Sequence, residues 1–152
     1  MVREEDAIAE IKLEKDLVFK TSIGLGRFKD FFIDETLDNN KDLEGPDAAQ
    51  MLGMAILSCL SASFIFCLAK RNLNLDDLEA RAEISFKKID RGYTRVKEIN
   101  IKIVPRTRNE ATLKRINQCV KEMKSGKMMF EENCIITESV REGIKVTVDI
   151  EI

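Results

Sequence analysis

Histidine is absent from this chain of 152 residues, and other missing features narrow the classes of function further. Without histidine, the chain lacks the commonest general base and metal ligand of proteins. Its four cysteines form no CxxC motif, so we predict no zinc site, no other metal and no cofactor. Lysine and arginine number 25 against 27 acidic residues. The sequence therefore lacks the basic surface typical of a nucleic-acid-binding protein.

Signals for export are missing as well. Residues 1–6 are acidic and contain no hydrophobic run, so a secretory signal is not expected. We therefore predict a cytoplasmic protein whose cysteines are free thiols rather than a disulfide framework. One segment, residues 51–69, is apolar except for one glycine and three serines. It is long enough to span a bilayer, but its place between predicted strands favours a helix buried inside a fold or a dimer, without membrane contact.

Periodicity predicts the order of elements along the chain. Alternating apolar and polar residues predict strands at 9–13, 17–23, 28–34, 78–86, 96–103 and 144–152, the fifth of them stopped by Pro105. The apolar helix opens at Gly45-Pro46-Asp47, a second helix opens at the capping box Thr107…Glu110, and a short third runs from about Asn133 to Arg141. No βαβ alternation and no linker are present, so we predict the α+β class and one domain over residues 1–152.

Two of the four cysteines stand in settings that suit thiol chemistry. Cys59 lies midway along a stripe of small residues on the apolar helix. Most free cysteines are small core hydrophobes, and a reactive Cys59 would need a positive charge from another element. Cys134 follows Asn133, a candidate N-cap, so the first turn of the short helix would favour its thiolate, although a half-buried inert thiol is the alternative. Cys67 and Cys119 are interpreted as packing residues.

The segment 45–59 resembles the OsmC-like family, which includes the organic hydroperoxide resistance proteins. It has the Gly-Pro, the acidic residue, the aliphatic-and-alanine helix and then Cys59, at a spacing that suits a divergent branch. Ile33-Asp34-Glu35 resembles the end of the third strand of the family. Residues 73–86 resemble its strand after the helix, and Cys134 lies where the family carries a Cys-Pro-Val motif.

The resemblance implies antiparallel sheets packed around a long buried central helix, in an intertwined homodimer with thiol sites at the subunit interface. By position, Cys59 would attack the O–O bond of an organic hydroperoxide, and Cys134 would resolve the sulfenic acid to a disulfide that an external dithiol reduces. Gln50 stands where the family has a catalytic glutamate. The arginine after the first strand is missing, leaving Arg27 or Lys15 as candidate cations. Ile135 replaces the proline after the second cysteine.

These departures leave two hypotheses open. The first is a thiol-dependent peroxidase that reduces organic hydroperoxides through Cys59 and Cys134, with Gln50 and Arg27 as further candidate catalytic residues. The second is a non-catalytic dimer of the same fold that binds an apolar ligand or a thiol carrier at the subunit interface. The neutral Gln50 and the missing arginine favour the second hypothesis.

Overall fold

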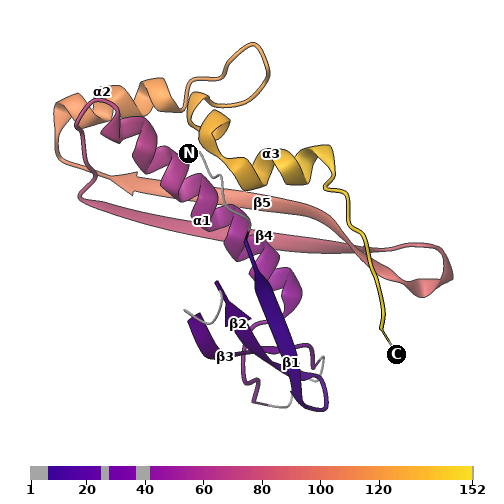
Figure 1. Cartoon of the computed structure of the whole chain (residues 1–152). Coiled ribbons are helices and arrows are strands. Elements are labelled where there is room, and N and C mark those ends of the chain that lie inside the picture. Colours follow the sequence, from indigo (N-terminus) through magenta and orange to yellow (C-terminus); the bar gives the residue numbers. More distant parts are fainter. Residues whose placement is uncertain (1–6, 25–27, 37–41, 152) are drawn as a thin grey trace. The chain divides into compact units, whose positions relative to one another are not determined.

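The computed structural model describes residues 7–24, 28–36 and 42–151, and shows an α+β chain with antiparallel strands (Figure 1). Its elements are β1 (Ala9–Lys15), β2 (Val18–Ile23), β3 (Phe28–Asp34), α1 (Ala48–Ala69), β4 (Asp77–Lys88), the 3-10 turn η1 (Asp90–Gly92), β5 (Thr94–Arg106), α2 (Glu110–Cys119), the 3-10 helix η2 (Met129–Asn133) and α3 (Ile135–Glu142). The predicted class is confirmed. Pro105 does not stop β5, which runs one residue past it.

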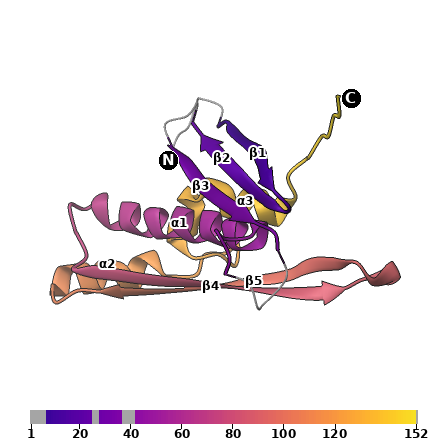
Figure 2. The ribbon, with the colours of Figure 1, turned by 90° about the horizontal axis from the view of Figure 1, so that it is seen from below.

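Contacts within the chain divide it into two compact units. One contains Ala55–Glu83 and Asn100–Ile152, and the other contains Val2–Met54 and Ile84–Ile99. Helix α1 and the hairpin of β4 and β5, seen edge-on in Figure 2, contribute residues to both units. The expectation of one domain over residues 1–152 stays a prediction.

The first three strands form an antiparallel meander in the order β1-β2-β3. Ala9 pairs with Ile23 and Val18 pairs with Asp34. A turn joins β1 to β2, and in it Asp16 takes a positive φ of 46°, a conformation that aspartate tolerates better than most residues do. Val18 and Thr21 of β2 are buried, whereas every residue of β1 is exposed. Two residues of the middle strand are therefore buried, whereas the edge strand β1 is exposed along its whole length.

The end of β3 holds the start of α1. Asp34 accepts hydrogen bonds from the backbone N–H of Thr36 at 3.0 Å and of Glu44 at 3.0 Å. These two bonds tie the residues directly after β3 to Glu44, four residues before the helix. Glu35 accepts from the N–H of Ala48 at 2.8 Å, satisfying one of the free donors of the first helical turn. The Asp-Glu pair thus acts as a helix anchor.

Gly45 is required by a close approach of two backbone segments. A Cβ atom at this position would lie 1.9 Å from the carbonyl oxygen of Phe32, a distance that no side chain can accept without backbone movement. The Gly-Pro that precedes α1 therefore has a steric reason in this chain.

Helix α1 buries one face and exposes the other. The buried face carries Ile56, Leu60, Ser63, Phe64, Cys67 and Leu68. The ring of Phe64 meets that of Phe130 edge-on, with centroids 5.2 Å apart. The opposite face, with Met54, Ile65 and Phe66, is exposed. By length and composition alone α1 could cross a membrane, but the buried face is that of a core helix.

Helix α2 starts later than its sequence predicts. Asn109 is its N-cap and accepts from the N–H of Thr112 at 3.0 Å, while Thr107 accepts from the N–H of Asn109 at 3.1 Å. The predicted capping box Thr107…Glu110 is therefore wrong. Both Thr107 and Asn109 are good capping residues, and β5 continues to Arg106, so the second of the two caps the helix.

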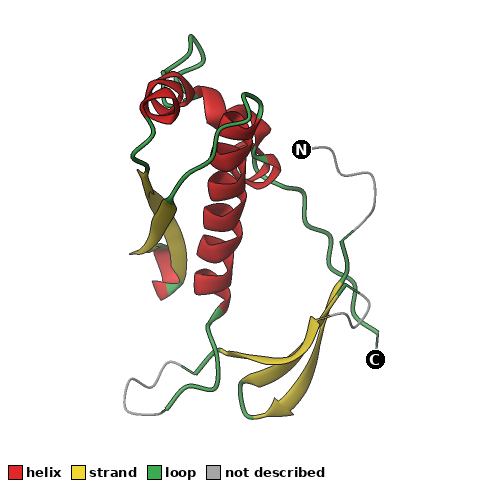
Figure 3. Cartoon of the chain, turned by 90° about the vertical axis from the view of Figure 1, so that its left-hand side faces the viewer, coloured by secondary structure: helices red, strands yellow, loops and turns green. Residues whose placement is uncertain are grey.

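The predicted strand at 144–152 is not present in the described residues. Residues 143–151 have no regular structure (Figure 3). The apolar side chains that alternate there, Ile144, Val146, Val148 and Ile150, are exposed, Val146 by 80%. Alternation encodes a strand with one face to be covered, but a strand also needs a neighbour for its backbone hydrogen bonds. No strand among the described residues of this chain pairs with it.

Candidate thiol site

Cys134 and Cys59 are the free cysteines of the described chain. Cys59 is half-buried in the middle of α1, and Cys134 is buried with 2% of its surface exposed. Cys134 itself is the N-cap of α3, because its sulfur accepts from the N–H of Thr137 at 3.4 Å. The Thr137 hydroxyl lies 2.9 Å from the same sulfur. The predicted N-cap Asn133 is instead the last residue of η2.

The fold brings the two free thiols together at the start of α3. The Cys134 thiol and the backbone N–H groups of Ile135 and Ile136 lie close enough to Cys59 to act on its pKa. Both cysteines belong to the same compact unit. The positive end of the dipole of α3, a helix of eight residues, is therefore near Cys59.

These neighbours act on the pKa of Cys59 in opposite directions. Burial raises the pKa above the ordinary 9.0, and the neighbouring Cys134 raises it further. The N–H groups of Ile136 and Ile135 lower it, and the balance is a raised pKa. Cys59 is therefore mainly a neutral thiol at pH 7, in a position where two backbone donors stabilise the thiolate once it forms.

The backbone N–H groups of Ile135 and Ile136 are functional groups that residue types cannot reveal. The sequence predicts that a reactive Cys59 needs a positive charge from outside α1, and it predicts a helix that starts near Cys134. That the start of α3 faces Cys59 follows only from the tertiary fold.

Gln50 is bound at the beginning of α1. Its side-chain oxygen accepts from the N–H of Asp47 at 3.0 Å, and Asp47 accepts from the N–H of Gln50 at 2.7 Å. This reciprocal pair is a capping box. Gln50 is nine residues before Cys59 in α1, a rise of about 13 Å, so its catalytic role stays a prediction. Arg27 lies outside the described residues, and Lys15 is paired with Glu44.

A network of charged side chains holds α3 in place. Arg141 pairs with Glu131 at 2.7 Å and with Glu138 at 2.8 Å, and Lys127 also pairs with Glu138. These pairs join α3 to η2 and to the loop before it, so they fix the helix whose start faces Cys59. In residues 7–24, 28–36 and 42–151, no group of three or more His, Cys, Asp or Glu side chains is arranged to hold a metal ion.

Cys67 and Cys119 form a disulfide, so the interpretation of both as packing thiols is wrong. Their Cα atoms are 6.2 Å apart, and 52 residues separate them in sequence. Arg115 donates from Nε and Nη2 to the carbonyl oxygen of Cys67, at 3.2 Å each. The bond joins the last turns of α1 and α2. Sequence spacing cannot show this pairing, because it depends on how α2 folds back against α1.

The fold is similar to several solved structures. An OsmC-like protein from Mycoplasma pneumoniae matches with a TM-score of 0.67 at 14% identity, over 91% of this chain and 89% of that one. An OsmC-like protein from Vibrio cholerae matches with a TM-score of 0.64 at 14% identity, over 90% and 94%. The organic hydroperoxide resistance protein OhrB of Bacillus subtilis gives a TM-score of 0.58 at 12% identity, over 90% and 91%.

Sequence comparison gives the family directly. No curated protein sequence matches the chain. The family model described as OsmC-like protein matches residues 39–149, a range that includes α1, the β4–β5 hairpin and both free cysteines. The low identities to the solved structures are consistent with a divergent branch. The chain belongs to the OsmC-like family.

Proposed function

We propose that the protein is a thiol-dependent peroxidase that reduces organic hydroperoxides, with Cys59 as the peroxidatic and Cys134 as the resolving cysteine. One observation supports this most: Cys59 lies beside both Cys134 and the backbone donors of Ile135 and Ile136. A peroxidatic thiol needs a stabilised thiolate and a second thiol within reach. The N–H groups at the start of α3 act toward the first need by lowering the pKa of Cys59 against the burial that raises it, and Cys134 is the candidate for the second.

The reaction would take two steps. The Cys59 thiolate attacks the terminal oxygen of the hydroperoxide, the O–O bond breaks, and the alcohol leaves after taking a proton. Cys59 is then a sulfenic acid. The Cys134 sulfur attacks the Cys59 sulfur, water leaves, and a disulfide forms. An external dithiol returns two electrons and two protons by thiol–disulfide exchange.

The apolar surroundings favour an organic substrate. Ile135 and Ile136 follow Cys134 at the start of α3, near Cys59, and α1 exposes the apolar side chains of Ile65 and Phe66. The structurally similar OhrB of Bacillus subtilis is named an organic hydroperoxide resistance protein. Burial of an alkyl group near Cys59 would add binding energy that hydrogen peroxide cannot provide.

We also propose a cytoplasmic homodimer, without nucleic acid or membrane as a partner. A second copy would cover the exposed face of α1, where Met54, Ile65 and Phe66 lie. It would also offer a neighbour to the exposed, alternating segment 144–150. Light scattering of the purified chain should give about twice its mass of 17.4 kDa, and a monomer would contradict this part.

The deciding experiment follows thiols through one turnover. Protein isolated without oxidant receives one equivalent of cumene hydroperoxide, and free thiols are counted before and after. We expect two thiols per chain to be lost and peptide mapping to find a Cys59–Cys134 bond. In Cys134→Ser, dimedone should label Cys59 as a sulfenic acid. Unchanged peroxide consumption in Cys59→Ser would overturn the proposal.

A second candidate is a non-catalytic dimer that binds an apolar ligand or a thiol carrier at the subunit interface. It is favoured by the raised pKa of Cys59 and by the capping role of Gln50. Native mass spectrometry of freshly purified protein would reveal such a ligand. Peroxide consumption without any co-purified ligand would exclude this candidate.

A further inference from the structure

The chain holds a second cysteine pair that the proposed peroxidase reaction does not use. We infer that Cys67–Cys119 is a permanent crosslink that clamps α2 to the end of α1 and that stays oxidised while Cys59 and Cys134 exchange electrons. The inference rests on the disulfide, its burial and the contacts around it, and it holds whether or not the protein is a peroxidase.

Burial protects this bond from reductants. Cys119 exposes 0% and Cys67 exposes 3% of its surface. Phe64 and Leu68, on the same face of α1, are fully buried next to Cys67. A thiolate reduces a disulfide by direct attack on one of the two sulfurs, so the attacking group must reach that atom. Reduction therefore requires this part of the fold to open first.

Distance separates the crosslink from the thiol site. Cys59 and Cys67 are eight residues apart in α1, which is a rise of about 12 Å. Bonded cysteines have Cα atoms no more than about 7 Å apart. A thiolate at Cys59 cannot attack Cys67 without unwinding the helix, so exchange between these two cysteines is blocked in the folded chain.

Contacts along α2 place the two sulfurs together. The N–H of Arg108 donates to Asp76 at 2.8 Å, and the Thr112 hydroxyl donates to the carbonyl of Asn74 at 3.4 Å. In the middle of α2, Arg115 donates to the Cys67 carbonyl in the last turn of α1. The first half of α2 and the residues before it are thus tied to the end of α1 and the segment after it, and the disulfide adds a link at the end of α2.

These contacts make oxidation of the pair intramolecular. A small-molecule disulfide would accept the two electrons: one cysteine displaces one of its thiols, the other cysteine displaces the second, and the two protons of the cysteines end on the two released thiols. Once the bond has formed, its burial prevents thiols in solution from attacking its sulfur atoms.

Differential alkylation of the native protein tests the inference. The chain is incubated with increasing dithiothreitol, labelled with iodoacetamide and digested without reduction. We expect the half-buried Cys59 to be labelled in the folded chain. The Cys67–Cys119 peptide should stay linked, and its reduction should be on the order of 100-fold slower in the folded chain than in the unfolded chain, because it requires opening of the fold. After unfolding in urea, the Cys67–Cys119 bond should reduce without this delay.

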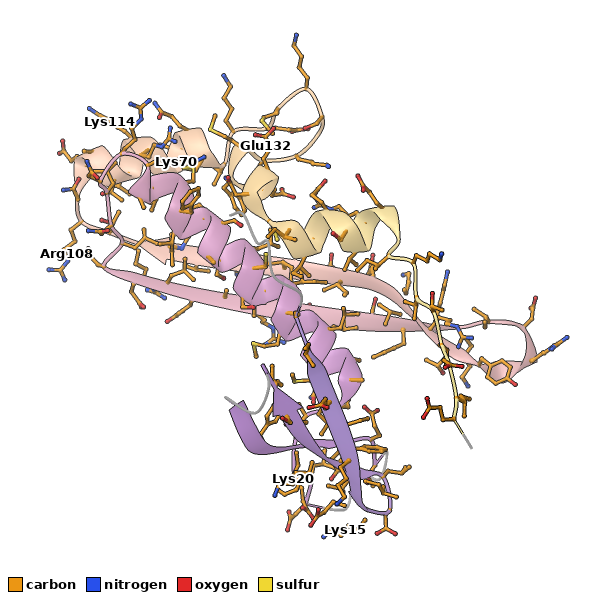
Figure 4. The ribbon with its side chains drawn as sticks, viewed as in Figure 1. Lys15, Lys20, Lys70, Arg108, Lys114 and Glu132 are labelled. Carbon is orange, nitrogen blue, oxygen red and sulfur yellow. A yellow bond between two sulfur atoms is a disulfide. The ribbon has the colours of Figure 1, made fainter. Side chains whose placement is uncertain are left out.

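A matched pair of variants locates the clamp. Lys114 is the neighbour of Arg115 on α2, has the same charge and points away from α1 (Figure 4). Arg115→Ala should speed reduction of Cys67–Cys119 several-fold, whereas Lys114→Ala should leave it unchanged. Free Cys67 and Cys119 thiols in the untreated wild-type chain, or reduction of the Cys67–Cys119 bond at the same rate in the folded and the unfolded protein, would overturn the inference.

Discussion

Both cysteine pairs combine a residue of α1 with one at the end of a later helix, but only Cys67 and Cys119 are bonded, and the surroundings of the two pairs differ. Cys59 is half-buried and meets the first turn of α3, with free backbone donors and a second thiol beside it. Cys67 is buried with Cys119 at the last turns of α1 and α2, where apolar side chains and the Arg115 clamp close over the bond. The clearest difference is access to Cys59, which is half-buried, whereas Cys67 and Cys119 are both buried.

Loss of the Cys59 sulfur should give the largest effect. We expect Cys59→Ser to lower organic hydroperoxide turnover by on the order of 1,000-fold or more, because a serine hydroxyl does not ionise at neutral pH. Ser58→Ala, the adjacent exposed position on α1, serves as the control and should keep turnover within about twofold. Peroxide consumption with a dithiol reductant, followed by absorbance, measures both variants.

Removal of the crosslink should act on stability instead of turnover. A disulfide between residues 52 apart restricts the unfolded chain, so Cys67→Ala with Cys119→Ala should lower the free energy of unfolding by about 4 kcal/mol. Urea unfolding of Cys59→Ser provides the comparison, and its free energy of unfolding should fall far less. Equal losses in the two variants would mean that the pairs do not differ as described.

The pH dependence of the thiol site should follow from the raised pKa of Cys59. Only the thiolate attacks peroxide, and its fraction below the pKa rises about tenfold per pH unit. The rate constant for oxidation of Cys59 should therefore still be rising at pH 9, the ordinary value for the group. Stopped-flow measurement from pH 6 to 9 checks this, and a plateau near pH 6 would contradict the raised pKa. The pH dependence of the rate at which the folded Cys67–Cys119 bond is reduced provides the comparison.

The smallest difference is expected at the Arg115 clamp. Arg115→Ala removes two hydrogen bonds to the Cys67 carbonyl, and because the side chain is partly exposed, the cost should be about 1 kcal/mol. Lys114→Ala should cost less than about 0.5 kcal/mol. Thermal unfolding of the oxidised proteins compares the two substitutions. Equal melting temperatures would mean that Arg115 does not stabilise the contact between α1 and α2.

Most of the fold could be predicted because its signals are local. The strands from β1 to β5 follow the alternation of apolar residues, and α1 follows its apolar run after Gly45-Pro46. The errors came where two local signals compete or where a partner is needed. Thr107 and Asn109 can both cap α2, and the alternating segment 144–152 has no neighbouring strand among the described residues.

The sequence by itself determined most of the elements, the family and the candidate cysteines Cys59 and Cys134, since each depends on residues close together along the chain. Tertiary structure alone decided what those cysteines meet. The start of α3 faces Cys59, and α2 brings Cys119 to Cys67 across 52 residues. No periodic pattern in the sequence predicts these two contacts, because both arise from the way helices far apart in the chain pack against α1. For the same reason, residue types alone predicted free packing thiols where the fold makes a disulfide.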